Sequence, residues 1–511
     1  MKRILALLLS TVLLVGVLSG CSTQPEVYVP TGNGLTWGEA TQPTSPVTEQ
    51  SLRLPYYPER GLNPIQTSDY VNQNLFSLVY QGLFAVDAEY KVHPILCKNY
   101  KVSKDMKTYV FYPEEATFPD GAVLTAEDVE ASFLAVMESE RFKGRFHNVK
   151  SVSLTDDGGI AVVLDTPYEN LPVLLDFPIV KKSQTGAERP LGTGPYVYER
   201  FGETLRLRRR SDWWCSAVLP LTAQYISLFQ GESPVQLRDE FEFSDLSMVT
   251  SDPGSSSYVD FHSNYELWGC ENGIFVYLGC NSKSEVLSNQ AVRAALTYAI
   301  DREVLAEAYY HGFAAPAVLP TSPQSPYYST ALAQKHGYDP QRLMQAVQDA
   351  GLVGAQVSLL VNVDDSVRLR TGRAIARMLS DSGLKVTTKE RNTKDYLSAL
   401  KSKSFDLYIG QTRLSANMDL SEFFDSKGAL NYGGMSDAAL YGLSLNALAN
   451  SGNYYTLHQK VLEDGKLTPL LFRSYAVFAR RGLFSGLTPA RDHVMFYTIG
   501  KTLSDALITE E

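Results

Sequence analysis

The sequence predicts an α/β fold, and three observations support this prediction. Between residues 357 and 410, runs rich in β-branched residues alternate with amphipathic stretches, a pattern typical of strands joined by crossover helices. In the first half, the β-branched and aromatic runs 108–112 and 159–164 predict further strands. Hydrophobic residues make up 44% of the 511-residue chain, which is enough to build the cores of two or three domains.

The N-terminus predicts a secretory signal that ends at a cysteine. Two basic residues precede the apolar stretch 4–18, which is shorter than the roughly 20 residues that a membrane-spanning helix needs. The run LSGC at 18–21 resembles a bacterial lipobox, which implies cleavage before Cys21 and lipid on its sulfur; an ordinary signal peptide with an incidental cysteine is the alternative. Residues 21–50 are rich in Ser, Thr, Pro and Gly without an apolar period, and they predict a flexible tether.

The following segment contains recognisable start signals for a helix and a strand. Thr125 to Asp128 form a capping-box pattern in front of an amphipathic run, so a helix is expected to begin there. The Gly- and Pro-rich run 192–200 predicts a turn that leads into a strand. The alternating run LRLRRR at 205–210 predicts a strand at a solvated sheet edge.

The second half is more regular. A helix is expected from the cap Asn289 to about His311, and another from Asp339 to the stop at Gly351. Because ligands of α/β folds usually lie at the carboxyl ends of the strands, the residues that follow each strand are candidate binding residues. The expected strands are 357–363, 384–388 and 405–410.

Charge and motif content argue against several functional classes. The formal net charge is −10 and no basic stripe is present, which argues against nucleic acid as a partner. The sequence contains no His-Glu-x-x-His or other local metal-ligand spacing, no Gly-x-Ser-x-Gly, no P-loop and no dinucleotide fingerprint. We therefore predict no catalytic residues, no metal and no cofactor.

Cysteines and tyrosines each leave two interpretations open. Cys97, Cys215, Cys270 and Cys280 form no Cys-x-x-Cys pair, so either one disulfide, with Cys270 and Cys280 nearest in sequence, or free buried thiols are compatible with the spacing. The 30 tyrosines include several doublets, which suit either a ligand cleft or core packing between lobes.

Several stretches in combination resemble one family, the solute-binding proteins of peptide- and nickel-type ABC importers (solute-binding protein family 5). The matching stretches run in family order from about residue 52 to 475: 62–84, 117–133, 191–199, 289–305, 338–352 and the strand FDLYIG at 405–410. The resemblance implies an α/β fold of the two-lobe, type II periplasmic-binding-protein class, with a hinge and a small subdomain inserted in lobe one. Closure of the lobes would trap a ligand between them.

The resemblance also implies a division of the chain. We expect a signal peptide, a lipidated cysteine with its tether, two lobes and the inserted subdomain. The boundaries are 1–20 for the signal, 21–50 for the tether, 51–65, 192–275 and 476–511 for lobe one, 66–191 for the inserted subdomain, and 276–475 for lobe two.

The chain departs from the peptide binders of this family at two places. Those proteins carry a Trp and, shortly after it, an Asp that pairs with the peptide amino terminus, but the corresponding stretch here has Thr412 and then Ser415 or Ala416. Either Asp419 has taken over that role or the ligand lacks a free amine, because a buried unpaired amine is costly. Gln81 stands where peptide binders often carry Glu, which again favours a cleft less selective for cations.

Three further residues complete the predicted ligand site. Arg413 follows a strand and would suit a carboxylate or phosphate, with a surface ion pair as the alternative. Asn362 and Asn417 are candidate amide contacts at strand ends, with capping as their alternative role. The predicted site is thus Gln81, Asn362, Arg413, Asn417 and Asp419.

The leading functional hypothesis is a non-enzymatic, monomeric receptor that delivers a peptide or peptide-like solute to the permease of an ABC importer. It would be anchored through Cys21 on the extracellular face of a bacterial membrane, or lie in a periplasm. The alternatives are a receptor for a sugar-containing solute or a metal chelate on the same scaffold, and a secreted hydrolase with an unmarked active site.

Overall fold

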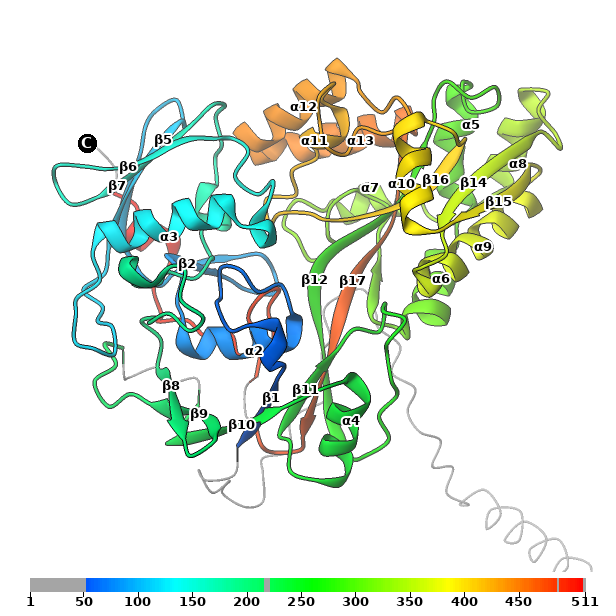
Figure 1. The fold of residues 1–511 in the computed structure, drawn as a ribbon. Coiled ribbons are helices and arrows are strands. Elements are labelled where there is room, and N and C mark those ends of the chain that lie inside the picture. Colours follow the sequence, from blue (N-terminus) through cyan, green and yellow to red (C-terminus); the bar gives the residue numbers. More distant parts are fainter. Residues whose placement is uncertain (1–51, 216–220, 485–486, 509–511) are drawn as a thin grey trace, which may run out of the picture.

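A computed structural model describes residues 52–215, 221–484 and 487–508, and it confirms the α/β class (Figure 1). The predicted signal peptide, Cys21 and the tether lie outside the described residues. Within those ranges no helix combines the length and the apolar character needed to cross a membrane. The lobe boundaries given above stay predictions.

The first lobe contains a four-stranded sheet of mixed direction. Its strands lie in the order β1 (Arg53–Tyr56), β10 (Tyr225–Gln230), β9 (Thr204–Arg209) and β8 (Tyr196–Phe201), with β1 parallel to β10 and the other pairs antiparallel. The expectation that LRLRRR forms a sheet edge was wrong, because β9 is hydrogen-bonded on both sides and β8 is the edge. Its alternation arises because Leu205 and Leu207 are buried on one face only. Helix α4 (Pro234–Phe243) accompanies this lobe, and α2 (Tyr70–Val79), which begins the predicted subdomain range, packs against β1 and β8.

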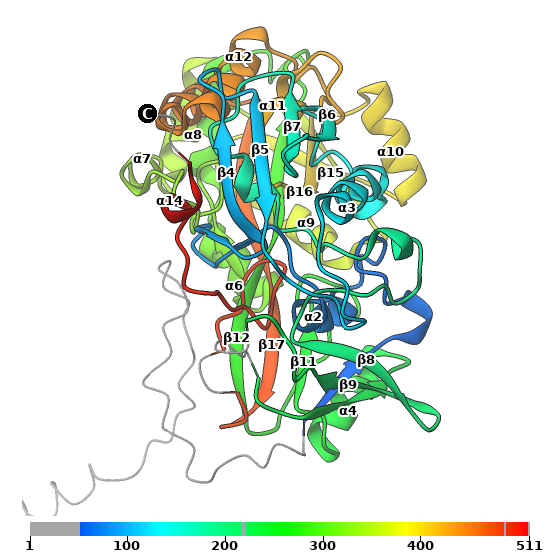
Figure 2. The ribbon, with the colours of Figure 1, turned by 90° about the vertical axis from the view of Figure 1, so that its left-hand side faces the viewer.

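The inserted subdomain has a sheet of its own. Its strands follow the order β4 (Cys97–Val102), β5 (Thr108–Pro113), β7 (Ile160–Leu164) and β6 (Val149–Leu154), and a small ribbon joins β2 (Phe84–Val86) to β3 (Val92–Pro94). Helix α3 (Ala126–Glu138) packs beside the sheet (Figure 2). The predicted capping box is confirmed, since Thr125 and Asp128 bond reciprocally at the start of α3.

Two long antiparallel strands run from one lobe into the other. Figure 1 shows β12 (Tyr265–Cys280) and β17 (Leu467–Arg480) crossing the centre of the molecule side by side. Their register shifts between Glu271 and Phe275, where Gly273 takes a φ of 70°. A positive φ is easy for glycine and strained for other residues, so Gly273 accommodates this bulge within the strand pair.

The second lobe completes the sheet around these strands. The order is β11 (Met248–Ser251), β17, β12, β16 (Leu407–Arg413), β14 (Gln356–Asn362) and β15 (Lys385–Arg391), with β13 (Ala314–Pro316) beside β17. Strand β14 is parallel to both β15 and β16, as the alternating pattern predicts. The helices that cover this lobe are α5 (Gln290–Ala295), α6 (Arg302–Tyr310), α7 (Thr330–Lys335), α8 (Pro340–Asp349), α9 (Ser366–Asp381), α10 (Thr393–Ser402), α11 (Ser421–Phe424), α12 (Ala438–Ala449) and α13 (Tyr454–Asp464); α14 (Leu503–Ala506) ends the described chain.

The expected single helix from Asn289 to His311 is interrupted. The chain turns extended at Ile300, and Asp301 caps a new helix by accepting a hydrogen bond from the amide of Val304. The buried guanidinium of Arg302 explains the interruption, because it donates hydrogen bonds to the carbonyl oxygens of Thr297, Ile300, Ala317 and Pro469. This interaction joins the helix start to strand β17.

Of the two interpretations of the cysteines, one disulfide or free thiols, the structure supports free thiols. Cys97, Cys215, Cys270 and Cys280 are all free, and burial raises the pKa of Cys97 to about 12 and that of Cys280 to about 12. Buried thiols of this kind behave as small apolar side chains.

Candidate functional site

The inserted subdomain and the second lobe touch directly. The ring of His147, in the loop after α3, lies 3.2 Å from a carboxylate oxygen of Asp419, which follows β16. A second contact joins Glu169 to α12 and the turn after it: its amide donates to the carbonyl of Leu448 over 3.0 Å, and its carboxylate accepts from the amide of Ser451 over 2.7 Å. The seam between these two parts is therefore the place where a ligand held between them would lie.

The pair His147–Asp419 is charged at neutral pH. The hydrogen bond to Asp419 raises the pKa of His147 to about 9, and the other ring nitrogen donates to the carbonyl of Gly144 over 2.8 Å. Burial alone raises the pKa of Asp419, but the hydrogen bonds from His147 and Ser421 outweigh it and lower the pKa. The Asp419 carboxylate, 5% exposed, is thus already engaged by a side chain of the opposite part.

Replacing His147 by glutamine is expected to remove a pH dependence of stability. Because the pKa of His147 is raised above its ordinary 6.5 to about 9, the contact contributes fully below about pH 6.5 and is lost as the pH rises through about 9. The melting temperatures of the original protein and of His147→Gln should therefore differ at pH 6 and converge near pH 10. Asp419→Asn should remove the same dependence; if either variant keeps it, the pair is not its source.

The centre of the seam holds a cluster of arginines around one aspartate. We call it the arginine cluster: Arg141, Arg145, Arg413 and Arg491, with Asp492 among them. Arg413, the last residue of β16, forms an ion pair with Asp492, and the Nε of Arg491 lies 3.9 Å from the same carboxylate. The cluster joins the subdomain loop after α3, the end of a lobe-two strand and the C-terminal segment.

Asp492, Arg141, Arg145 and Arg413 are charged at pH 7. Burial by itself raises the pKa of Asp492, but the surrounding guanidiniums, Arg413 first, hold it well below its usual range. Burial lowers the pKa of Arg141 to about 10 and that of Arg145 to about 9, so both stay protonated at pH 7. His493, beside Asp492, is neutral at pH 7 because burial lowers its pKa to about 4.

Gln81 faces the same region from the chain that follows α2. Its side-chain oxygen accepts hydrogen bonds from the hydroxyl of Thr193 over 3.0 Å and from the indole of Trp214 over 2.9 Å. Gln81 and His493 line two adjoining cavities, each of about 20 Å³, and the walls of one of these also include Arg141, Arg145 and Asp492. A volume of this size holds about one water molecule, so a solute enters only when the two parts separate.

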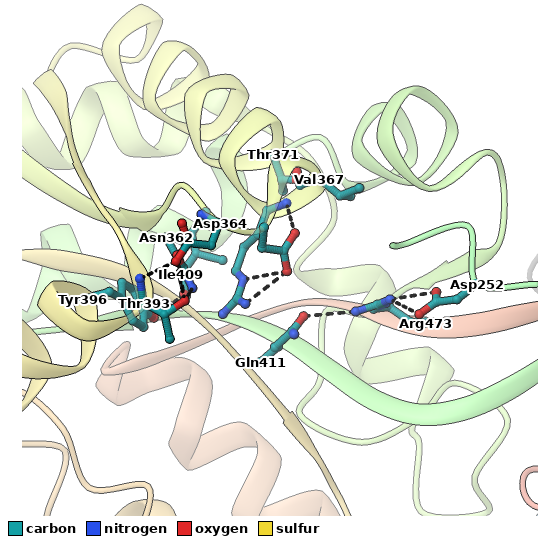
Figure 3. A network of polar contacts seen from close by, with 12 residues as sticks. Asp252, Asn362, Asp364, Val367, Thr371, Thr393, Tyr396, Ile409, Gln411 and Arg473 are labelled. Atoms are coloured by element: carbon teal, nitrogen blue, oxygen red, sulfur yellow. Dashed lines mark hydrogen bonds and ion pairs between the residues drawn. The ribbon is translucent and has the colours of Figure 1, made fainter. Parts of the chain in front are cut away.

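The strands between the lobes carry a second charged contact (Figure 3). Arg473 of β17 donates to both carboxylate oxygens of Asp252, which follows β11, and to the side-chain oxygen of Gln411 on β16. Nearby, the buried carboxylate of Glu271 accepts hydrogen bonds from Tyr90 of the subdomain and Ser322 of the second lobe. Both contacts fix how the strand pair passes from one lobe to the other.

The two predicted asparagines have local partners. Figure 3 shows Asn362 at the end of β14, where its side-chain amide donates to the hydroxyl of Thr393 and its oxygen accepts from the amide of Asp364. The side-chain oxygen of Asn417 accepts a long bond, 3.4 Å, from the amide of Asp419. Neither asparagine is the N-cap of a neighbouring described helix, since those positions are Asp365, Asn392 and Leu420. Both bond a local turn, and among the predicted residues Gln81 and Arg413 are the two that the structure brings to the arginine cluster.

Four residues of the arginine cluster were not predicted from the sequence. Arg141, Arg145, Arg491 and Asp492 lie far from Arg413 in sequence, and no local motif places them together. The one local signal is the run RFKGRFH at 141–147, where two arginines alternate with phenylalanines that become buried walls.

The chain matches the family described as bacterial extracellular solute-binding proteins, family 5, over residues 91–431. It is 24% identical over 316 residues to the glutathione-binding protein GsiB of Salmonella typhi, and the matched region covers 57% of this chain and 59% of that protein. The chain therefore spans about three fifths of the length of the curated relatives that it matches.

Solved structures share the fold over nearly the whole molecule. The ABC transporter substrate-binding protein CtaP of Listeria monocytogenes superposes with a TM-score of 0.70 at 18% identity, over 90% of this chain and 99% of that one. The oligopeptide-binding protein AppA of Bacillus subtilis, solved with a nonapeptide, gives 0.59 at 20% identity, over 88% and 99%. These matches confirm the two-lobe fold that the sequence predicts. The chain belongs to family 5 of the bacterial extracellular solute-binding proteins.

Proposed function

We propose that this protein is the solute receptor of an ABC importer and that it captures peptides or peptide-like solutes between its closing lobes. The observation that carries the proposal is the arginine cluster, in which charged side chains of the subdomain, the second lobe and the C-terminal segment converge at the seam. Family membership supports it, since these are extracellular solute-binding proteins. A long strand pair with a glycine bulge supplies a bending point for closure.

Three further features belong to this proposal. The receptor works as a monomer, it hands its solute to the permease subunits, and Gln81 and Arg413 contact the solute. Asp419 contacts a solute only after His147 releases it, because their ion pair occupies the carboxylate in this structure.

Native mass spectrometry of the protein purified from cells grown in rich medium tests the proposal. A receptor retains an intact small molecule of defined mass, which leaves on denaturation, and re-addition of that molecule shrinks the radius of gyration as the lobes close. A secreted hydrolase instead cleaves members of a peptide library and retains none of them. Cleavage without retention, or no retained molecule together with an unchanged radius for peptides, sugar-containing solutes and metal chelates, would overturn the proposal.

We also propose that lipid on Cys21 anchors the receptor at the outer face of the cell membrane. Two or more acyl chains hold a protein at a bilayer far better than one does, and the tether of residues 21–50 keeps the receptor within reach of its permease. Cys21→Ala is expected to appear in the medium or to stay unprocessed, as fractionation and immunoblotting will show. A variant that remains membrane-bound at the mature size contradicts the anchor.

A further inference from the structure

The arginine cluster carries more positive charge than its own carboxylates offset. Among the described residues, its four guanidiniums face the carboxylates of Asp492 and Asp176, the latter paired with Arg145. The neighbouring pairs His147–Asp419 and Arg473–Asp252 are each balanced within themselves. Burial raises the pKa of Glu271, which shifts that nearby carboxyl toward its neutral form. The seam is therefore a cationic site within a chain whose formal net charge is −10.

Several hydrogen-bond donors of these arginines are buried and unused. Within the part of the chain that the structure describes, the Nε of Arg141, the Nε of Arg145, and both the Nε and one terminal nitrogen of Arg491 have no acceptor. The Arg491 side chain is only 9% exposed. A guanidinium has five N–H donors, and leaving a buried charged donor unpaired is costly. In a ligand site, such donors are available to the ligand.

Two of the arginines with unused donors line one cavity whose walls are partly aromatic. Arg141 and Arg145 line it together with His493, and the ring of Phe142 lies 4.7 Å from the Arg141 guanidinium and 5.5 Å from that of Arg145. Aromatic walls fix the planes of the guanidiniums and lower the local dielectric, which strengthens bonds to an anion. Arg413 is different: its side chain is 37% exposed although it meets Asp492 at the centre of the seam, so water reaches the cluster from the side of β16.

We propose that the solute of this receptor carries a net negative charge and binds through a carboxylate held by Arg141, Arg145 and Arg491. The proposal rests on the receptor function proposed above and names the solute class. Asp492 stays among the arginines when the lobes are closed, and a carboxylate of the solute takes the donors that Asp492 leaves unused. The planar fork of each guanidinium matches a carboxylate in a bidentate geometry.

Binding calorimetry with matched solute sets tests the proposal. The sets are tripeptides rich in Asp and Glu, neutral tripeptides, tripeptides rich in Lys, the acidic tripeptides with amidated C-termini, and free di- and tricarboxylic acids. We expect the acidic set to bind about 10-fold or more tightly than the neutral set, since hydrogen bonds between charged groups are the strong ones. The amidated and free-acid sets separate a peptide C-terminus from side-chain or non-peptide carboxylates.

Variants assign the effect to the cluster. Arg491→Gln and Arg145→Gln are expected to weaken binding of the acidic set about 10-fold or more, and Arg491→Lys to weaken it less, because lysine keeps the charge but not the fork. Arg208→Gln is the matched control, since Arg208 lies on β9 and pairs with Glu199 away from the seam. Because a variant can fail to fold, the salt dependence of binding is also measured on the unaltered protein, and affinity for the acidic set should fall as salt rises.

The outcomes separate this inference from the receptor function. The anionic-solute inference is overturned if the neutral or lysine-rich set binds most tightly. It is also overturned if the affinity for the acidic set changes neither with salt nor in Arg491→Gln. In both cases the protein can still be a solute receptor. Binding of no set, with no molecule retained in native mass spectrometry, overturns both.

Discussion

Replacing Asp492 by asparagine is expected to lower the free energy of unfolding by about 3 kcal/mol, because removing one partner of a buried ion cluster leaves the opposite charges uncompensated. The variant keeps the side-chain shape but leaves Arg141, Arg145, Arg413 and Arg491 without their shared counter-ion. We expect a loss of stability near the lower end of the range for broken buried ion pairs, because the Arg413 side chain is 37% exposed. Urea denaturation at pH 7 measures it.

An anionic solute should offset part of this loss. If a solute carboxylate binds the same arginines, saturating solute stabilises Asp492→Asn more than it stabilises the original protein, since the variant lacks its internal anion. Asp245→Asn is the control: Asp245 pairs with Arg53 at the surface with its side chain 70% exposed, and such pairs contribute about 0–1 kcal/mol. A loss for Asp492→Asn no greater than that of the control would show that the cluster is not held by this carboxylate.

The second large effect concerns the fold of the second lobe. Arg302→Met is expected to lower the free energy of unfolding by about 3–5 kcal/mol, because buried carbonyl oxygens left without donors cost about 1–3 kcal/mol each. Arg302 is 5% exposed and burial lowers its pKa to about 10, yet its guanidinium bonds four carbonyl groups and the hydroxyl of Thr297. Methionine fills the space but donates no hydrogen bond.

The matched control for Arg302 is Arg373→Met. Arg373 pairs with Glu390 at the surface with its side chain 53% exposed, so its loss should stay within about 1 kcal/mol. Urea denaturation of the two variants in parallel gives the comparison. Equal losses would mean that the Arg302 bonds do not hold α6 against β17.

The sequence predicted elements whose signals are local. The strands of the second lobe were recognisable from their composition, and the caps Thr125 and Asn289 from residue type and spacing, because these features act within a few residues. The prediction of one helix reaching His311 was wrong because a residue far along the chain determines where the helix is interrupted. The carbonyl of Pro469 accepts a hydrogen bond from Arg302. The edge assignment of β9 failed because pairing partners are set by topology, not by alternation.

The candidate site was predicted in part for the same reason. Arg413 was identifiable because it ends a strand, and Gln81 because it departs from a family pattern, whereas their convergence with Arg491 and Asp492 depends on the C-terminal segment folding back over the seam. Asn362 ends a strand as Arg413 does, but it bonds a local turn. A strand-end position therefore marks candidates without distinguishing residues that reach the seam from residues that bond a local turn.

A crystal structure of the protein with the solute that it retains from rich medium tests the central claim most directly. We expect the solute at the seam between the inserted subdomain and the second lobe. A carboxylate oxygen should lie within hydrogen-bond distance of the Arg491 or Arg145 guanidinium, with Gln81 at the wall of the site. A solute bound elsewhere, with the arginines arranged around Asp492 as they are here, would contradict it.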